Sequence, residues 1–230
     1  MRVIFNEELK QVADDLDRMA QNVRKAIKGA GEALLNQDVE AAQTVIDGDI
    51  EIDALESSVI DQCVKLLAKQ NPVATDLRVV VSTMRLASTF ERMGDLARHV
   101  AIRCPGAAAP RRPYPAAAIP ESAQPVFAEM IDFLDNTADQ LVAMLFDRDA
   151  KTAEAIILAD DKLDNLHHQT FDLALSDDIT RQQTVDIVLL GRFLERLGDH
   201  AVSAARRVVY IVSGFDPTKE PTRDEGTDID

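Results

Sequence analysis

The spacing of apolar residues most constrains what this chain can fold into. From residue 9 onward they alternate three and four positions apart, at Leu9, Val12, Leu16, Met19, Val23, Ala26, Ala30 and Ala33. This period places them on one face of an α-helix that packs against other helices. Tryptophan is absent and only 4% of residues are aromatic, so the helices must pack through aliphatic side chains. The sequence therefore predicts an all-α fold.

Turn signals divide each half of the chain into three helices. Asn36-Gln37-Asp38 predicts a turn in which Asp38 caps the next helix. Pro72 disfavours helix at Asn71, so a third helix begins just after it. Asp147–Asp149 and Ser176–Asp178 mark the corresponding turns of the second half. The predicted domains are a first three-helix bundle at 1–104, a Pro-rich linker at 105–125, a second three-helix bundle at 126–215, and a disordered acidic tail at 216–230.

The two halves are an internal duplication. The turns at Asn36 and Asp147 lie 111 residues apart, and so do Asp49 and Asp160. The segments Glu91-Arg-Met-Gly-Asp95 and Glu195-Arg-Leu-Gly-Asp199 lie 104 residues apart. The second half is shorter by about two helical turns, so equivalent side chains keep almost the same facing. We therefore expect two tandem, similar three-helix bundles.

Charge limits the partners of this chain. The formal net charge is -15, which repels nucleic acid and anionic lipid and favours cationic partners and metal ions. Cys63 and Cys104 show no metal-type spacing, the start lacks the pattern of a signal peptide, and no apolar run approaches the ~20 residues of a membrane span. We expect a reduced, cytoplasmic protein that reaches the inner face of the membrane only through partners.

Acidic residues spaced four apart recur on neighbouring helices in each half. Asp49 with Asp95, and Asp53 with Glu91, are both centred on residue 72, so in an antiparallel hairpin these carboxylates lie level. The pattern repeats around the next turn of the second half. The first acidic set is Asp49, Asp53, Glu91 and Asp95, and the second acidic set is Asp160, Asp164, Glu195 and Asp199.

Each acidic set is a candidate metal site. Like charges four residues apart on a helix repel one another, and a bound cation would remove that cost. Oxygen ligands alone suit Mg, Mn, Fe or Ca. A solvated acidic face is the alternative that the pattern leaves open. Gly94 and Gly198 recur inside the helices at equivalent positions, which indicates either tight helix packing or a requirement of the metal site.

The motifs resemble those of the PhoU family. The resemblance rests on the repeated Glu-Arg-x-Gly-Asp, the acid-x-x-x-Asp pairs before it, and Pro72-Val-Ala-Thr-Asp-Leu-Arg78, and it covers residues 5 to 214. The second half has Ile179-Thr-Arg181 where the first has the Pro72 segment. The resemblance implies two similar three-helix bundles, with multinuclear clusters of iron, zinc or manganese on the two acidic sets.

The resemblance also implies a function. Members of the family act as negative regulators of phosphate uptake and of the phosphate-starvation response. They couple the ATPase subunit of a phosphate ABC transporter to a sensor histidine kinase, and a homodimer is expected by the same analogy. Arg78, Arg92 and Arg196 are candidate partner contacts, although for Arg92 and Arg196 ordinary pairing on the helix surface is the favoured interpretation.

Other function classes find less support in the sequence. Di-iron carboxylate enzymes combine Glu residues with Glu-x-x-His pairs, and no such pair occurs here. A Gly-rich phosphate loop and a Gly-x-Ser-x-Gly elbow are also absent, so we expect a protein that is not an enzyme. A metal-binding storage or scaffold protein without a signalling role is the alternative.

Overall fold

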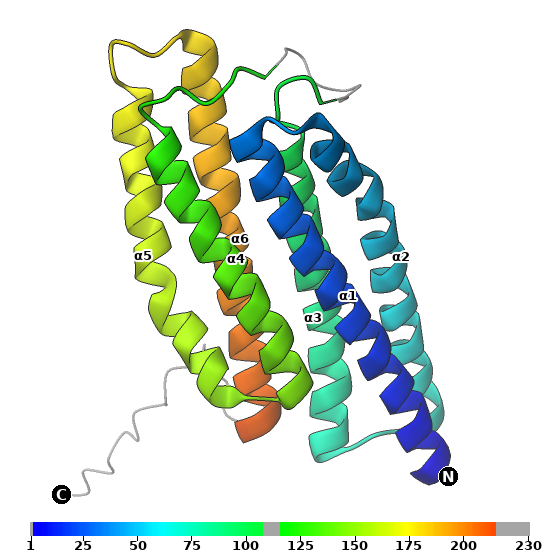
Figure 1. The fold of residues 1–230 in the computed structure, drawn as a ribbon. Coiled ribbons are helices and arrows are strands. Elements are labelled where there is room, and N and C mark those ends of the chain that lie inside the picture. Colours follow the sequence, from blue (N-terminus) through cyan, green and yellow to red (C-terminus); the bar gives the residue numbers. More distant parts are fainter. Residues whose placement is uncertain (1, 108–115, 215–230) are drawn as a thin grey trace, which may run out of the picture.

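The computed structural model describes residues 2–107 and 116–214, and within these ranges it contains only helices (Figure 1). The all-α prediction is confirmed. Residues 108–115 of the predicted linker and the predicted tail at 216–230 lie outside the described residues. The helices are α1 (Arg2–Asn36), α2 (Val39–Gln70), α3 (Ala74–Ala101), α4 (Gln124–Asp147), α5 (Ala150–Ala174) and α6 (Arg181–Ser213).

The same turn chemistry separates the first two helices of each bundle. The carboxylate of Asp38 accepts hydrogen bonds from the backbone N–H groups of Glu40 and Ala41 at 2.9 and 3.0 Å. Asp149, at the equivalent turn, accepts from the N–H of Lys151 at 2.9 Å. These caps satisfy donors that the first turn of a helix leaves unpaired. The cap predicted at Asp38 is confirmed.

The second bundle begins slightly earlier than the sequence suggested. We expected helical spacing to restart at Val126, but α4 begins at Gln124 and has a proline in its first turn. A proline is tolerated there because its missing N–H would have no partner inside the helix in any case. Proline in this segment therefore marks the start of α4 as well as the end of the connection.

The two bundles lie side by side, with α1 against α4 and α3 against α6 (Figure 1). In each of these pairs the two helices run in opposite directions (Figure 1). His99 of α3 stacks on Phe193 of α6 with ring centroids 5.2 Å apart. At the end of α3, Arg103 forms an ion pair of 2.7 Å with Asp186 of α6. Aromatic, ionic and aliphatic contacts thus join the bundles into one body.

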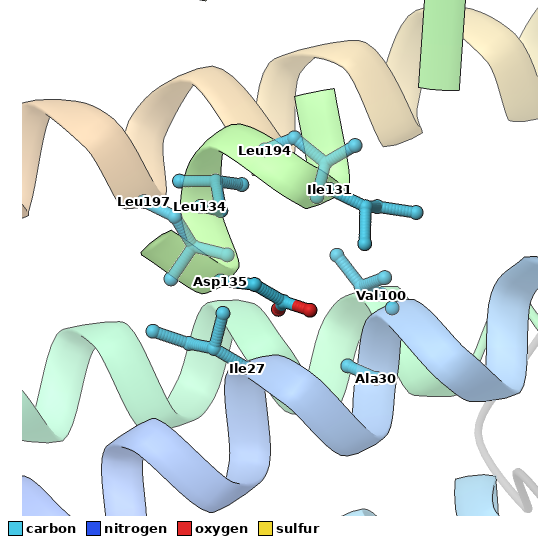
Figure 2. Close-up of a pocket in the computed structure, with 9 residues that line it drawn as sticks. Ile27, Ala30, Val100, Ile131, Leu134, Asp135, Leu194 and Leu197 are labelled. Carbon is cyan, nitrogen blue, oxygen red and sulfur yellow. The ribbon is translucent and has the colours of Figure 1, made fainter. Parts of the chain in front are cut away.

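A small cavity of about 10 Å³ lies where α1, α3, α4 and α6 meet. Figure 2 shows the carboxylate of Asp135 among Ile27, Val100, Leu134 and Leu197 from these four helices. The Oδ1 atom of Asp135 is buried and has no hydrogen-bond partner among the described residues. Burial raises the pKa of Asp135, nearby Lys28 opposes that rise, and Asp139 and Asp132 add to it. The interface between the bundles therefore contains a carboxylate whose buried oxygen lacks a hydrogen-bond donor among the described residues.

Candidate functional site

The hairpin of α2 and α3 brings the first acidic set together. Burial raises the pKa of Asp49; Arg98 lowers it, and the charges of Asp53 and Asp95 raise it further. Burial also raises the pKa of Glu91. The charge of Arg92 lowers this pKa, and the charges of Asp95, Glu56 and Asp53 raise it further. Carboxylates on the two helices therefore lie close enough to repel one another, as the symmetric spacing about residue 72 predicted.

Two arginines of α3 already neutralise part of the first acidic set. Arg98 Nε forms an ion pair of 2.6 Å with Asp49 Oδ2. Its Nη2 donates a hydrogen bond of 3.0 Å to Asp95 Oδ1. Arg92, whose side chain is 61% exposed, lies 3.3 Å from Glu91 and 3.4 Å from Asp95. Of these contacts, the one from Arg98 to Asp49 is the least exposed to solvent.

The hairpin of α5 and α6 brings the second acidic set together in the same way. Burial raises the pKa of Asp160, Asp164 and Asp199 add to the rise, and Arg206 opposes it. Burial and the charge of Asp199 raise the pKa of Glu195, and the charge of Arg192 lowers it. Arg192 Nη1 donates a hydrogen bond of 2.7 Å to Glu195 Oε1.

Gly94 and Gly198 are explained by helix packing. A Cβ atom on Gly94 would lie 2.9 Å from Ile52 Cδ1 and 3.4 Å from Asp49 Oδ1. A Cβ atom on Gly198 would overlap Leu163 Cδ2 and would lie 3.4 Å from Asp160 Oδ1. The glycines thus let the acid-bearing helix approach closely in both bundles, and of the two interpretations the packing one is observed.

The chemistry of the donors decides how well each set fits a metal ion. Within the described ranges, no three His, Cys, Asp or Glu side chains are placed so that they could hold one ion, so the carboxylates of either set would have to rotate toward a common centre. In the second set Asp164 and Asp199 are exposed and free to do so. The carboxylates of the second set suit a hard cation once they rotate, whereas in the first set the guanidinium of Arg98 already contacts Asp49 and Asp95.

The three arginines that the sequence singled out have different surroundings. Arg78 donates a hydrogen bond of 3.2 Å to the carbonyl of Ile211 and lies over the ring of Tyr210. Its guanidinium therefore holds the start of α3 against the end of α6. Arg92 shows the surface pairing described above, and Arg196 is exposed. Sequence reasoning missed Arg98 and Arg192, although each lies three residues from an acid of its own set, a spacing that signals pairing on a helix.

The fold and the repeated acidic sets define a class: duplicated helical bundles in which each half presents one cluster of carboxylates. The PhoU domain matches this sequence twice, over residues 16–103 and 127–208. The chain belongs to the PhoU family.

Similar proteins cover almost the whole chain. A protein of Mycobacterium tuberculosis named phosphate-specific transport system accessory protein PhoU homolog 1 is 34% identical, over 96% of this chain and 98% of its own. A PhoU homolog of Rhizobium meliloti is 27% identical over 97% of this chain and 93% of its own. The crystal structure of PhoU from Pseudomonas aeruginosa superposes with a TM-score of 0.80 at 27% identity, covering 92% of this chain and all of that one.

Within the described residues, every helix is either too short or too polar to cross a bilayer.

Proposed function

We propose that this chain is a negative regulator of phosphate uptake and of the phosphate-starvation response, and that it couples a phosphate ABC transporter to a sensor histidine kinase. In this role it binds the ATPase subunit of the transporter and the cytoplasmic part of the kinase, without nucleic acid. It works in the cytoplasm at the inner membrane face, which it reaches through these partners, and as a homodimer.

One observation carries this proposal. The relatives named as phosphate-specific transport accessory proteins match this chain from end to end, 98% of their own length in the case of the Mycobacterium tuberculosis protein. These relatives therefore share both bundles in the same order. The names of these relatives describe an accessory protein of phosphate transport, which favours a protein that acts through binding.

The proposal includes metal binding by the acidic sets. The residues that would hold the ions are Asp49, Asp53, Glu91 and Asp95 on α2 and α3, and Asp160, Asp164, Glu195 and Asp199 on α5 and α6. A bound iron, zinc or manganese ion would supply positive charge that removes the mutual repulsion of these carboxylates. The pKa values raised by burial support this, because they indicate carboxylates held in an unfavourable environment.

Deletion of the gene in its host tests the regulatory role. In phosphate-rich medium we expect phosphate uptake to rise and a reporter of the starvation response to switch on, with both restored by the wild-type chain. Binding of the purified chain to the ATPase subunit and to the cytoplasmic part of the kinase should be measurable by calorimetry. A deletion strain whose reporter stays off would refute regulation, and a chain that binds neither protein would refute coupling.

Metal content separates the regulator from a scaffold or store. The purified chain is compared by plasma mass spectrometry with a variant carrying Glu91→Gln, Asp95→Asn, Glu195→Gln and Asp199→Asn, and with a control carrying Asp47→Asn and Asp161→Asn, exposed acids outside both sets. Metal lost only in the first variant supports the sites. Equal trace metal in all three removes metal from the proposal, and abundant metal without partner binding favours storage.

A further inference from the structure

The two acidic sets are equivalent by duplication but differ at several positions beside them, and residue 98 is one of these. Arg98 follows Asp95 by three residues, and Val202 follows Asp199 by three residues, so the two occupy the same place in their bundles. Arg98 is partly exposed and charged, whereas Val202 is buried, with 4% of its surface accessible. At this position the first half therefore has a cationic side chain and the second half an aliphatic one.

Arg98 makes the contacts that a bridging cation would make. Its Nε lies 2.6 Å from Asp49 on α2, and its Nη2 donates a hydrogen bond of 3.0 Å to Asp95 on α3. The side chain of Asp49 is only 11% exposed and that of Arg98 28% exposed, so water screens this pair weakly. One guanidinium thus ties the carboxylates of two helices together, the task that a divalent cation performs with shared carboxylates.

The second acidic set has no such cation. Among the described residues, neither Asp160 nor Asp199 has an Arg, Lys or His nitrogen within 4.0 Å. Arg206, about two turns beyond Asp199, lowers the pKa of Asp160 only through its charge. Arg192 pairs with Glu195 at the edge of the set and leaves the carboxylates of Asp160 and Asp199 unbridged.

We propose that Arg98 is the resident cation of the first acidic set, and that the two sets therefore bind divalent metal unequally. The second set takes the ion once its carboxylates rotate toward a common centre, and the first does so only when the guanidinium of Arg98 also swings out. This inference rests on the proposed metal binding. Displacing Arg98 sacrifices one short ion pair and one charge-assisted hydrogen bond, so we expect the first set to be on the order of tenfold or more weaker.

The first set retains a free acceptor for metal once Arg98 is removed. Asp49 is 8% exposed, and its Oδ1, which faces Gly94, accepts no hydrogen bond among the described residues. A buried carboxylate oxygen without a donor is costly. Replacing Arg98 by an apolar residue should therefore convert the first set into a second tight metal site.

Calorimetric titration of the full chain with Mn²⁺, with bound metal counted by plasma mass spectrometry after dialysis, tests this inference. The wild type should show one tight ion per chain, lost in Asp160→Asn/Asp164→Asn and kept in Asp49→Asn/Asp53→Asn. Arg98→Val, which installs the residue of the second set, should gain a second tight ion. Arg98→Met keeps the apolar stem of the arginine and repeats the test if the valine variant unfolds. Arg98→Lys keeps the positive charge and should therefore not gain a second tight ion.

The outcomes distinguish this inference from the proposal beneath it. Two equally tight ions in the wild type, or one ion in Arg98→Val and Arg98→Met alike, would overturn the role of Arg98 while leaving metal binding in place. The absence of tight Mn²⁺ from the wild type and from both Arg98 variants would overturn metal binding itself, and the inference with it.

Discussion

Asp186→Asn should destabilise this protein more than any surface substitution. Asp186 is 3% exposed, and its carboxylate accepts hydrogen bonds from Arg103 at 2.7 Å, from Gln182 at 3.0 Å and from the backbone N–H of Ala117 at 2.9 Å. These donors come from the end of α3, from α6 itself and from the segment that precedes α4. One buried carboxylate thus joins both bundles and their connection.

The expected magnitude follows from burial. Replacing Asp186 by an amide breaks its buried ion pair with Arg103, and breaking such a pair costs about 3–5 kcal/mol. The amide keeps one acceptor oxygen, so we expect about 3 kcal/mol for Asp186→Asn, which for a chain of this size lowers Tm by about 6–12 °C. Urea titration followed by circular dichroism measures the free energy of unfolding directly.

A matched control uses an exposed ion pair. Glu129→Gln removes a carboxylate from a pair of 3.0 Å with Lys162, in which both side chains are more than half exposed. Such pairs contribute about 0–1 kcal/mol, so the control should scarcely change the unfolding curve. If the two variants lose the same free energy of unfolding, burial is not what makes Asp186 important and the reasoning is wrong.

Three further predictions follow from the packing. Gly198→Ala should lower the free energy of unfolding by about 1–3 kcal/mol because the new Cβ would overlap the side chain of Leu163. Gly48→Ala should raise it by up to ~1 kcal/mol in the same urea titration, because its Cβ would point into open space beside the helix. Burial raises the folded pKa of Asp135 above its unfolded value, so the folded chain holds this proton more tightly and the group reduces stability as pH rises from ~4 through the folded pKa. Asp135→Asn should therefore gain most over the wild type near neutral pH and least in acid, and a gain that is independent of pH would refute the assignment. Burial raises the pKa of the Cys63 thiol to about 11, so a thiol reagent should modify it only after unfolding, which absorbance measures.

The sequence was sufficient to predict the helices because the determinants of each helix are local. Asp38 and Asp149 cap helices through backbone groups two residues away, and both can be recognised without knowing the rest of the fold. The level placement of the acidic sets also followed, because a short turn fixes which residues of an antiparallel pair face each other. The helices and the level placement of the acids depend only on the spacing of residues along the helix and on the positions of the turns.

The contacts between bundles could not be predicted in the same way. Arg103 and Asp186 lie 83 residues apart in the chain, and nothing near either residue signals its partner. The electrostatic state of the first acidic set was missed for a different reason. The spacing of the acids alone does not show their pairing with arginines, although Arg98 lies on the same helix face as Asp95. A comparison of all equivalent positions in the two halves would have found Arg98, because Val202 contrasts with it.

The interface between bundles shows that the two halves are not interchangeable. On α1, Arg24 and Lys28 lie 3.5 and 2.7 Å from the carboxylate of Asp139 on α4, and Asp139 is the equivalent of Lys28, 111 residues later. Two identical bundles facing each other would place like charges together at these positions, which is unfavourable. A duplicated chain can keep the cations in one half and the acids in the other. Joining the two bundles in one chain therefore allows the halves to become unequal. The difference between Arg98 and Val202 is another instance of the same divergence.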